Sequence, residues 1–244
     1  MSDCLMSSPL IQLSGVDLSL GRGAARVHIL RGISLEVGHG EAVGLVGPSG
    51  SGKSSLLMTV AGLERVDAGK VEIAGQDLAK LDEDDLAEFR GRNIGIVFQS
   101  FHLIPTMTAL QNVAVPLELA GREDAFERAV AELQAVGLGD RLAHYPAELS
   151  GGEQQRVAVA RALAPNPAII CADEPTGNLD ETTGAQIADL IFRLRNERGA
   201  TLLLVTHDLP LAERCDRIVH MRSGTVDAGL ADAADRAVVA PAPV

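Results

Sequence analysis

The chain has 244 residues, of which 46% are hydrophobic and 22% charged, so a disordered or fibrous protein is excluded and one or two folded domains are expected. Its 33 acidic and 21 basic residues give a net charge of −12, which argues against a nucleic-acid partner because such binding normally needs a basic face. Three widely spaced cysteines exclude a disulfide framework and favour a reducing, cytoplasmic compartment. With only six aromatic residues, the core is expected to be aliphatic.

Short strand-like runs alternate with helical patterns along the chain, which is typical of an α/β domain. Strands are predicted at 42–46, 71–74, 93–98, 168–172 and 201–205, with a final strand pair at about 217–226. Helices are predicted at 53–61, 150–164 and 181–198, and a helical block at 108–136 separates two α/β halves. Residues 81–92 are expected to form a surface helix or loop. No run approaches the ~20 apolar residues of a membrane span, and residues 1–9 lack the features of a signal peptide.

A glycine-rich loop follows the apolar run Ala42–Val46 and precedes a predicted helix. Its sequence GPSGSGKS matches G-x-x-x-x-G-K-[ST], in which glycines let backbone N–H groups converge on a polyphosphate at a helix N-terminus. Lys53 would reach the β- and γ-phosphates, and the Ser54 hydroxyl would bind Mg²⁺. A chance Gly/Ser loop is the alternative, but the chain has only three lysines. The predicted phosphate-binding residues are Gly47, Pro48, Ser49, Gly50, Ser51, Gly52, Lys53, Ser54 and Ser55.

The sequence LSGGEQ opens the predicted helix at 150–164, with Ser150 and Glu153 at the spacing of a capping box. An ordinary capped helix is one interpretation. Gly151 and Gly152, however, lower helix propensity without a structural gain that the sequence reveals. We therefore expect a phosphate of another molecule to approach the backbone there, where a helix N-terminus favours anions.

Two acidic residues, Asp173 and Glu174, end the apolar strand at 168–172. Asp173 suits a Mg²⁺ ligand, and Glu174 suits a group that polarises an attacking water. Paired acids at a strand end are otherwise often a solvated turn. His207 follows the strand at 201–205 and could contact the γ-phosphate or the Glu174 carboxylate, while Gln99 follows the strand at 93–98 and could reach Mg²⁺ or the attacking water.

The order GPSGSGKS, Gln99, LSGGEQ, ADEPTGNLD and His207 resembles the ATP-binding subunits of ABC transporters over about 10–226. The stretch VFQSFHLIPT at 97–106, followed by QNV at 111–113, is similar to the lipoprotein-release and macrolide-export branch, and within it to the YbbA-type ATPases. The resemblance implies an α/β P-loop NTPase core with an antiparallel β-subdomain and an inserted helical subdomain at about 100–165. The ABC domain would span 10–228, between a disordered N-terminus (1–9) and a flexible tail (229–244).

The resemblance also implies a head-to-tail dimer that encloses two ATP molecules with Mg²⁺. Each ATP would lie between one chain's Lys53 loop and the other chain's Ser150, Gly151, Gly152 and Glu153, with Asp180 in a loop that crosses the interface. Glu174 and His207 would be catalytic, and Ser54, Gln99 and Asp173 would hold the metal. The groove near 99–112 would receive a membrane permease, which places the ATPase at the inner face of the plasma membrane without inserting into it.

The expected function is ATP hydrolysis that powers export or extraction of a lipophilic or lipoprotein-type substrate. Soluble ABC ATPases of DNA maintenance or translation are the alternative, but no heptad run separates Lys53 from Ser150 and the chain holds only one such domain. A regulatory module that binds ATP without turnover is a third possibility, against which Glu174 and His207 argue.

Leu20 occupies the position where the family often stacks an aromatic ring on adenine. We therefore expect weaker base contact, from Leu20, Arg26 and Val27, and poor discrimination between ATP and GTP.

Overall fold

The computed structural model describes residues 8–21 and 23–226. The predicted flexible tail at 229–244 and all but the last two residues of the predicted disordered N-terminus at 1–9 lie outside these residues. The bounds of the predicted domain therefore stay a prediction, and the architecture described below belongs to the two described segments.

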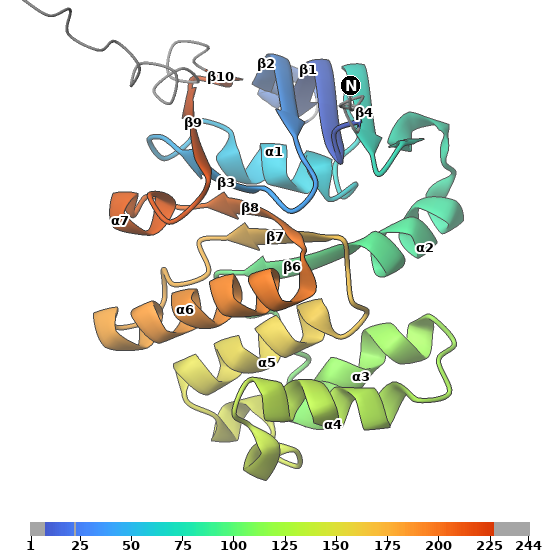
Figure 1. The fold of residues 1–244 in the computed structure, drawn as a ribbon. Coiled ribbons are helices and arrows are strands. Elements are labelled where there is room, and N and C mark those ends of the chain that lie inside the picture. The colour runs from blue at the N-terminus through green and yellow to red at the C-terminus, as the bar shows by residue number, and fades with distance from the viewer. Residues whose placement is uncertain (1–7, 22, 227–244) are drawn as a thin grey trace, which may run out of the picture.

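Two sheets build the domain (Figure 1). The antiparallel sheet has the order β2-β1-β4-β5 and consists of β1 (Ile11–Leu20), β2 (Val27–Val37), β4 (Ala68–Ile73) and β5 (Gln76–Asp77). The second sheet has the order β10-β9-β3-β8-β7-β6 and consists of β3 (Ala42–Val46), β6 (Ile94–Phe98), β7 (Ile169–Asp173), β8 (Thr201–Val205), β9 (Arg217–Arg222) and β10 (Thr225–Val226). Only β10 runs antiparallel to its neighbour there, so the predicted α/β class with an antiparallel subdomain is confirmed.

The helices are α1 (Lys53–Val60), α2 (Glu83–Asn93), α3 (Ala109–Leu119), α4 (Ala125–Ala135), α5 (Gly151–Leu163), α6 (Glu181–Arg198) and the short α7 (Leu209–Ala212). Four 3₁₀ turns lie at Gly23–Ala25, Leu78–Lys80, Gly139–Arg141 and Pro146–Glu148. Local chemistry sets many of these bounds: Thr108 and Gln111 form a capping box at the start of α3, and Gly199 ends α6 in the left-handed conformation. The helices α3, α4 and α5 lie between β6 and β7 in the sequence, although these two strands are hydrogen-bonded neighbours in the sheet. The helices α3 and α4 fall within the helical block predicted at 108–136.

Side chains of the parallel strands alternate between two hydrophobic cores. Leu203 and Val205 of β8 pack with α1 and the antiparallel sheet, whereas Leu202 and Leu204 pack with α5 and α6. Figure 1 shows the same layers, with α1 between the sheets and α5 and α6 on the opposite face of the parallel sheet. Because both faces are covered, the strands read as continuous apolar runs, which made them predictable.

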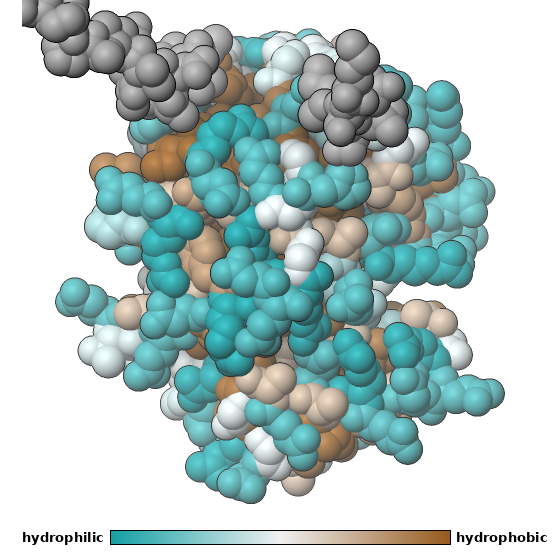
Figure 2. All heavy atoms as spheres, in the orientation of Figure 1, coloured by the Kyte–Doolittle hydropathy of each residue, from teal (hydrophilic) through white to brown (hydrophobic). Residues whose placement is uncertain are grey.

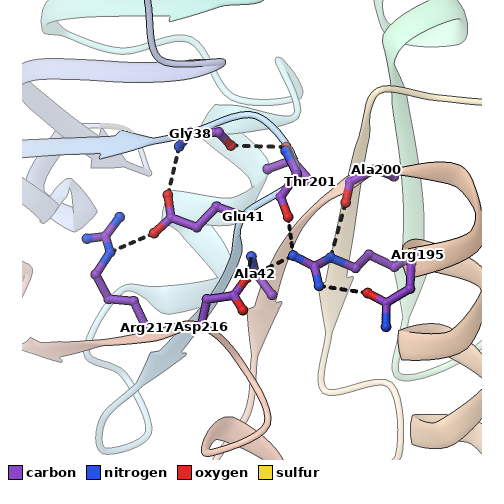
Figure 3. A network of polar contacts seen from close by, with 10 residues as sticks. Gly38, Glu41, Ala42, Arg195, Ala200, Thr201, Asp216 and Arg217 are labelled. Atoms are coloured by element: carbon purple, nitrogen blue, oxygen red, sulfur yellow. Dashed lines mark hydrogen bonds and ion pairs between the residues drawn. The ribbon is translucent and has the colours of Figure 1, made fainter. Parts of the chain in front are cut away.

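A polar network fixes the amino ends of the parallel strands (Figure 3). The Arg195 guanidinium at the end of α6 pairs with Asp216 at 2.8 Å, and Asp216 accepts a 2.7 Å hydrogen bond from the N–H of Ala42. Arg217 pairs with Glu41 at 2.8 Å on the next strand. These contacts anchor α6, β3 and β9 at one edge of the sheet, so the carboxyl ends of the strands are left to form a site at the opposite edge.

The described part of the chain contains no helix of the length and apolarity that a bilayer crossing requires. In the view of Figure 2, hydrophilic residues cover most of the middle of the molecule, while hydrophobic residues show mainly toward its upper and lower ends.

Candidate functional site

The loop at 47–52 can adopt its conformation only with glycine at specific positions. Gly47 has φ +153°, and a Cβ there would lie 2.1 Å from the carbonyl oxygen of Met221 on β9. Gly52, with φ +100°, is the N-cap of α1, where a Cβ would lie 3.2 Å from the carbonyl oxygen of Ile29. The loop therefore lies against its neighbouring strands and leads directly into the N-terminus of α1, the arrangement that binds anions.

Lys53 is folded back over this loop. Its ammonium Nζ donates to the carbonyl oxygens of Gly47 at 2.9 Å and Pro48 at 3.0 Å, and the side chain is largely buried. The hydroxyl oxygen of Ser51 is also buried and has no hydrogen-bond partner among the described residues. Ser51 does not line the pocket formed by this loop, so its hydroxyl adds nothing to the site. The glycine cradle and the buried ammonium at one helix N-terminus fit a polyphosphate.

Asp173, at the carboxyl end of β7, accepts a 2.9 Å hydrogen bond from the Ser54 hydroxyl of α1. Burial raises the pKa of Asp173, and the neighbouring Glu174 charge adds to the rise, while Ser54 and Lys53 oppose it. A bound cation would offset that desolvation and hold Asp173 ionised. One carboxylate and one hydroxyl are a donor set that fits Mg²⁺, which keeps several water and phosphate ligands.

Glu174 has a left-handed backbone, with φ +47°, and its N–H donates to the Val205 carbonyl oxygen of β8 at 2.9 Å. A carboxylate oxygen of Glu174 lies 2.8 Å from Nδ1 of His207, so of the two contacts that the sequence left open for His207 the structure shows the one with Glu174. The Glu174 side chain is 18% exposed and that of His207 is 75% exposed. The imidazole thus orients one carboxylate oxygen from the solvent side and leaves the other available for a water.

Gln99 is held by the loop that follows Glu174. Its Nε2 donates to Oδ1 of Asn178 at 3.2 Å, and Nδ2 of Asn178 donates to the Gln99 carbonyl oxygen at 3.0 Å. A Cβ at Gly177 would lie 2.7 Å from the Gln99 amide nitrogen, so a larger residue there would displace this side chain. The side-chain oxygen of Gln99 is therefore the end that can face a metal or a water.

One pocket brings these predicted residues together. It is lined by Ile29, Gly47, Ser49, Gly50, Gly52, Lys53, Ser54, Ser55, Gln99, Glu174, Val205 and His207. Asp173 adjoins it through Ser54. Ile29 of β2 was not predicted, because no sequence pattern marks a residue of the other sheet as a neighbour of the loop. Leu20, Arg26 and Val27 do not line this pocket, and Arg26 instead pairs with Asp67 at 2.6 Å; the predicted base contacts stay a prediction.

The second predicted phosphate site lies elsewhere on the chain, at the start of α5. Ser150 caps this helix by accepting from the Glu153 N–H at 3.3 Å, and the Glu153 carboxylate accepts from the Ser150 N–H at 2.8 Å. The Ser150 hydrogen bonds and the nearby Arg141 lower the pKa of Glu153 to about 2. None of Ser150, Gly151, Gly152 and Glu153 lines the Lys53 pocket, so the two predicted phosphate-binding elements lie apart on one chain.

The sequence argument that both glycines of this turn lack a structural reason is wrong for Gly152. A Cβ at Gly152 would lie 2.5 Å from the Thr183 methyl of α6, so the close packing of α5 against α6 requires glycine. At Gly151 the nearest atom would be a Leu179 methyl at 3.4 Å, an ordinary contact. The expectation of an approaching phosphate therefore rests on Gly151, Ser150 and the helix N-terminus.

Asp180 caps α6 by accepting from the Thr183 N–H at 3.0 Å, and its hydrogen bonds with Thr183 lower its pKa. Asp180 lines a second hollow, which is also lined by His207, Pro210 and Arg214. Asp180 thus lies beside the Lys53 pocket rather than in it, because His207 borders both hollows.

Comparison with known proteins agrees with this geometry. Residues 30–177 match the family model described as ABC transporter. The chain is 51% identical over 217 residues to the ABC transporter ATP-binding protein YbbA of Escherichia coli K12, covering 88% of this chain and 95% of that protein. It is 46% identical to the lipoprotein-releasing system ATP-binding protein LolD 2 of Caulobacter vibrioides, covering 91% and 98%.

The fold is also found among solved structures. A dimeric post-hydrolysis state of the ATP-binding cassette MJ0796 bound to ADP and Pi matches with a TM-score of 0.82 and 42% identity, covering 89% of this chain and 96% of that one. A second dimeric structure of MJ0796, described as a bacterial ABC transporter cassette, matches equally well. These relatives are transporter subunits and give no support to a soluble ATPase of DNA maintenance or translation. The chain belongs to the ABC transporter family, as an ATP-binding subunit with ATPase activity.

Proposed function

We propose that this chain hydrolyses ATP in a head-to-tail dimer and thereby drives a membrane permease. The observation that carries the proposal is the division of the predicted site: the Lys53 pocket gathers Gln99, Glu174 and His207, while the Ser150 turn faces elsewhere on the same chain. A second copy that brings its Ser150 turn to this pocket would complete it. The dimeric cassettes of MJ0796 support such an assembly.

In the proposed reaction Glu174 accepts a proton from a water while the water oxygen bonds to the γ-phosphorus of ATP. The bond from that phosphorus to the oxygen of the β-phosphate breaks, so ADP and phosphate are released and the proton remains on the Glu174 carboxylate until it returns to solvent. His207 keeps the carboxylate oriented through its 2.8 Å contact. Lys53 would exchange the carbonyl oxygens of Gly47 and Pro48 for phosphate oxygens, which spread the charge that develops in transfer.

Ser54 and Asp173 would hold Mg²⁺, with the side-chain oxygen of Gln99 beside it. The ion neutralises phosphate charge when bound. The Ser54 hydroxyl and the Asp173 carboxylate already lie 2.9 Å apart, and Asn178 engages the Gln99 amide nitrogen, which leaves the amide oxygen for the ion. Asp180 and Glu153 would contribute at the dimer interface, Glu153 as part of the Ser150 turn that its carboxylate caps.

The relatives suggest what the hydrolysis drives. The name of LolD 2 assigns it to lipoprotein release, and the stretch at 97–106 is similar to the lipoprotein-release and macrolide-export branch. We infer export or extraction of a lipophilic or lipoprotein-type substrate, with a permease docked near 99–112 at the inner face of the plasma membrane. Membranes from cells that express a tagged chain should yield an integral membrane protein on affinity purification; recovery of the chain alone would count against the permease.

The central test is Glu174→Gln, which removes the proton acceptor but keeps the shape of the side chain. Turnover of ATP should fall by about 10²–10⁴-fold, the usual contribution of a general base. Binding of ATP should persist, and light scattering with ATP should show a dimer that no longer dissociates. Glu127→Gln, an exposed carboxylate on α4, is the matched control and should leave turnover unchanged. Near-normal hydrolysis by Glu174→Gln would refute the role of Glu174.

A further inference from the structure

Gln155 is a fully buried amide in the first half of α5, the helix that begins at the Ser150 turn. Its place on the helix turns its side chain toward the carboxyl ends of β6 and β7, the two neighbouring strands that lead to Gln99 and Glu174. None of the proposed reaction steps uses Gln155.

The amide nitrogen of Gln155 donates to two backbone carbonyl oxygens. One is that of Phe98 at 3.3 Å, and the other is that of Pro175 at 2.6 Å. Phe98 immediately precedes Gln99, and Pro175 immediately follows Glu174. A single NH₂ group therefore joins the peptide units next to the two side chains that are proposed to handle the metal and the attacking water.

The side-chain oxygen of Gln155, unlike its amide nitrogen, makes no hydrogen bond with the described residues. Oε1 of Gln155 is buried and has no hydrogen-bond donor among the described residues. A buried acceptor without a donor destabilises the fold, so a side chain chosen for stability alone would not present one. The two N–H groups are what the structure uses, and they act on a segment that is itself strained, because Glu174 has φ +47°.

A second side chain of α5, Arg161, also binds the backbone that follows Gln99. The Arg161 guanidinium donates to the carbonyl oxygens of Phe101 at 2.8 Å and His102 at 2.6 Å. Both of these residues have positive φ, +60° and +49°. Through Gln155 and Arg161, α5 is thus bonded to the backbone on both sides of Gln99 as well as after Glu174.

We propose that Gln155 is a positioning residue for ATP hydrolysis, which sets the distance between the backbone at Gln99 and the backbone at Glu174. Because Gln155 belongs to the helix that starts at the Ser150 turn, a shift of that turn on contact with the partner's nucleotide moves both catalytic side chains together. This inference rests on the proposed roles of Glu174 and Gln99. It adds the route by which the Ser150 turn of one site affects hydrolysis at the other.

The first experiment replaces Gln155 by methionine, which has similar length and no donor. We expect kcat for ATP to fall about 10–100-fold, because small displacements of reacting groups cost that much, while the KM for ATP changes less than about threefold. Thr201→Val is the matched control. Thr201 is also fully buried and makes two hydrogen bonds with backbone, at 2.8 Å with the Gly40 N–H and 3.1 Å with the Gly38 carbonyl oxygen, but at the amino edge of the sheet. Its loss should lower Tm and leave kcat and KM unchanged.

The second variant, Gln155→Glu, tests the need for a donor by a pH profile. An ionised carboxylate would face the two carbonyl oxygens of Phe98 and Pro175 and repel them, whereas the protonated acid donates to one of them. The ratio of kcat between Gln155→Glu and wild type should therefore rise several-fold as the pH is lowered from 8.5 to 6, while the same ratio for Thr201→Val stays flat. This comparison decides the matter if the methionine variant does not fold.

Wild-type kcat in a folded Gln155→Met protein, or a pH-independent ratio for Gln155→Glu, would overturn the inference. Glu174→Gln is measured in the same assay to separate the two proposals. If Glu174→Gln is inactive and Gln155→Met is fully active, only the positioning role fails. If Glu174→Gln hydrolyses ATP normally, the proposed function itself fails.

Discussion

The contact between Gly152 and Thr183 gives a sharp test of why the turn at the start of α5 contains glycine. In Gly152→Ala the new methyl would lie 2.5 Å from the Thr183 methyl, about 1 Å closer than ordinary carbon contacts allow. Thr183 cannot move away easily, because its N–H is bonded to Asp180 and its β-branched side chain has few rotamers. Overpacking of this kind costs about 1–3 kcal/mol, and alanine returns up to ~1 kcal/mol of helix propensity. We expect a net loss of about 1–2 kcal/mol.

The assay is a double-mutant cycle with Thr183→Ser, which removes the clashing methyl and keeps the N–H that binds Asp180. A loss of about 1–2 kcal/mol should lower the Tm of Gly152→Ala by roughly 2–8 °C, and Gly152→Ala with Thr183→Ser should recover it. ATP turnover should recover in parallel, because the added methyl points at α6. If the stability losses of Gly152→Ala and Thr183→Ser simply add in the double variant, the packing explanation is refuted. Recovered stability with turnover still lost would show that Gly152 is needed for an approaching phosphate after all.

Three further predictions concern single residues. Lys53→Ala should weaken ATP binding at least ~100-fold in calorimetry, since a phosphate in the pocket loses its buried ammonium; tight binding would contradict the assignment of the loop. Glu153, whose pKa is lowered from 4.5 to about 2, contributes stability that is complete above about pH 4.5 and is lost as the pH falls toward 2. The free energy of unfolding, measured with urea, should therefore fall less between pH 5 and pH 3 for Glu153→Gln than for wild type. Equal falls in the two proteins would rule out this linkage. Leu20→Tyr should raise the affinity for ATP by about 5–150-fold if the base reaches this position, from ~1–3 kcal/mol of stacking, and an unchanged Kd would place the base elsewhere.

Part of the architecture follows from local patterns. The strands at 42–46 and 201–205 were predicted from short apolar runs, and the helix at 181–198 from its helical pattern. The long strands β1 and β2 were not predicted from the residue pattern. Their pairing shifts register between Leu13 and Val16 and again before Leu18, close to Gly15 at φ +59°, so the alternation that marks a strand is interrupted.

The glycine-rich loop could be predicted from local sequence, because all of its parts lie within eight consecutive residues: the glycines, Lys53 and the start of α1 define one another through local backbone geometry. The capping box of Ser150 and Glu153, which spans four residues, was predictable in the same way. Such contacts need no distant partner, so a short stretch of sequence is enough to predict them.

Which of these elements share a site depends on the folded arrangement of the strands and could not be predicted from any one motif. The sheet order β3-β8-β7-β6 brings Ser54 within 2.9 Å of Asp173, 119 residues away in sequence, and sets His207 beside Glu174. It also reveals that Gln155 bonds to the backbone beside both Gln99 and Glu174. The physical reason is that strand order arises from burying two apolar faces of one sheet at once, a property of the whole chain that no single motif encodes.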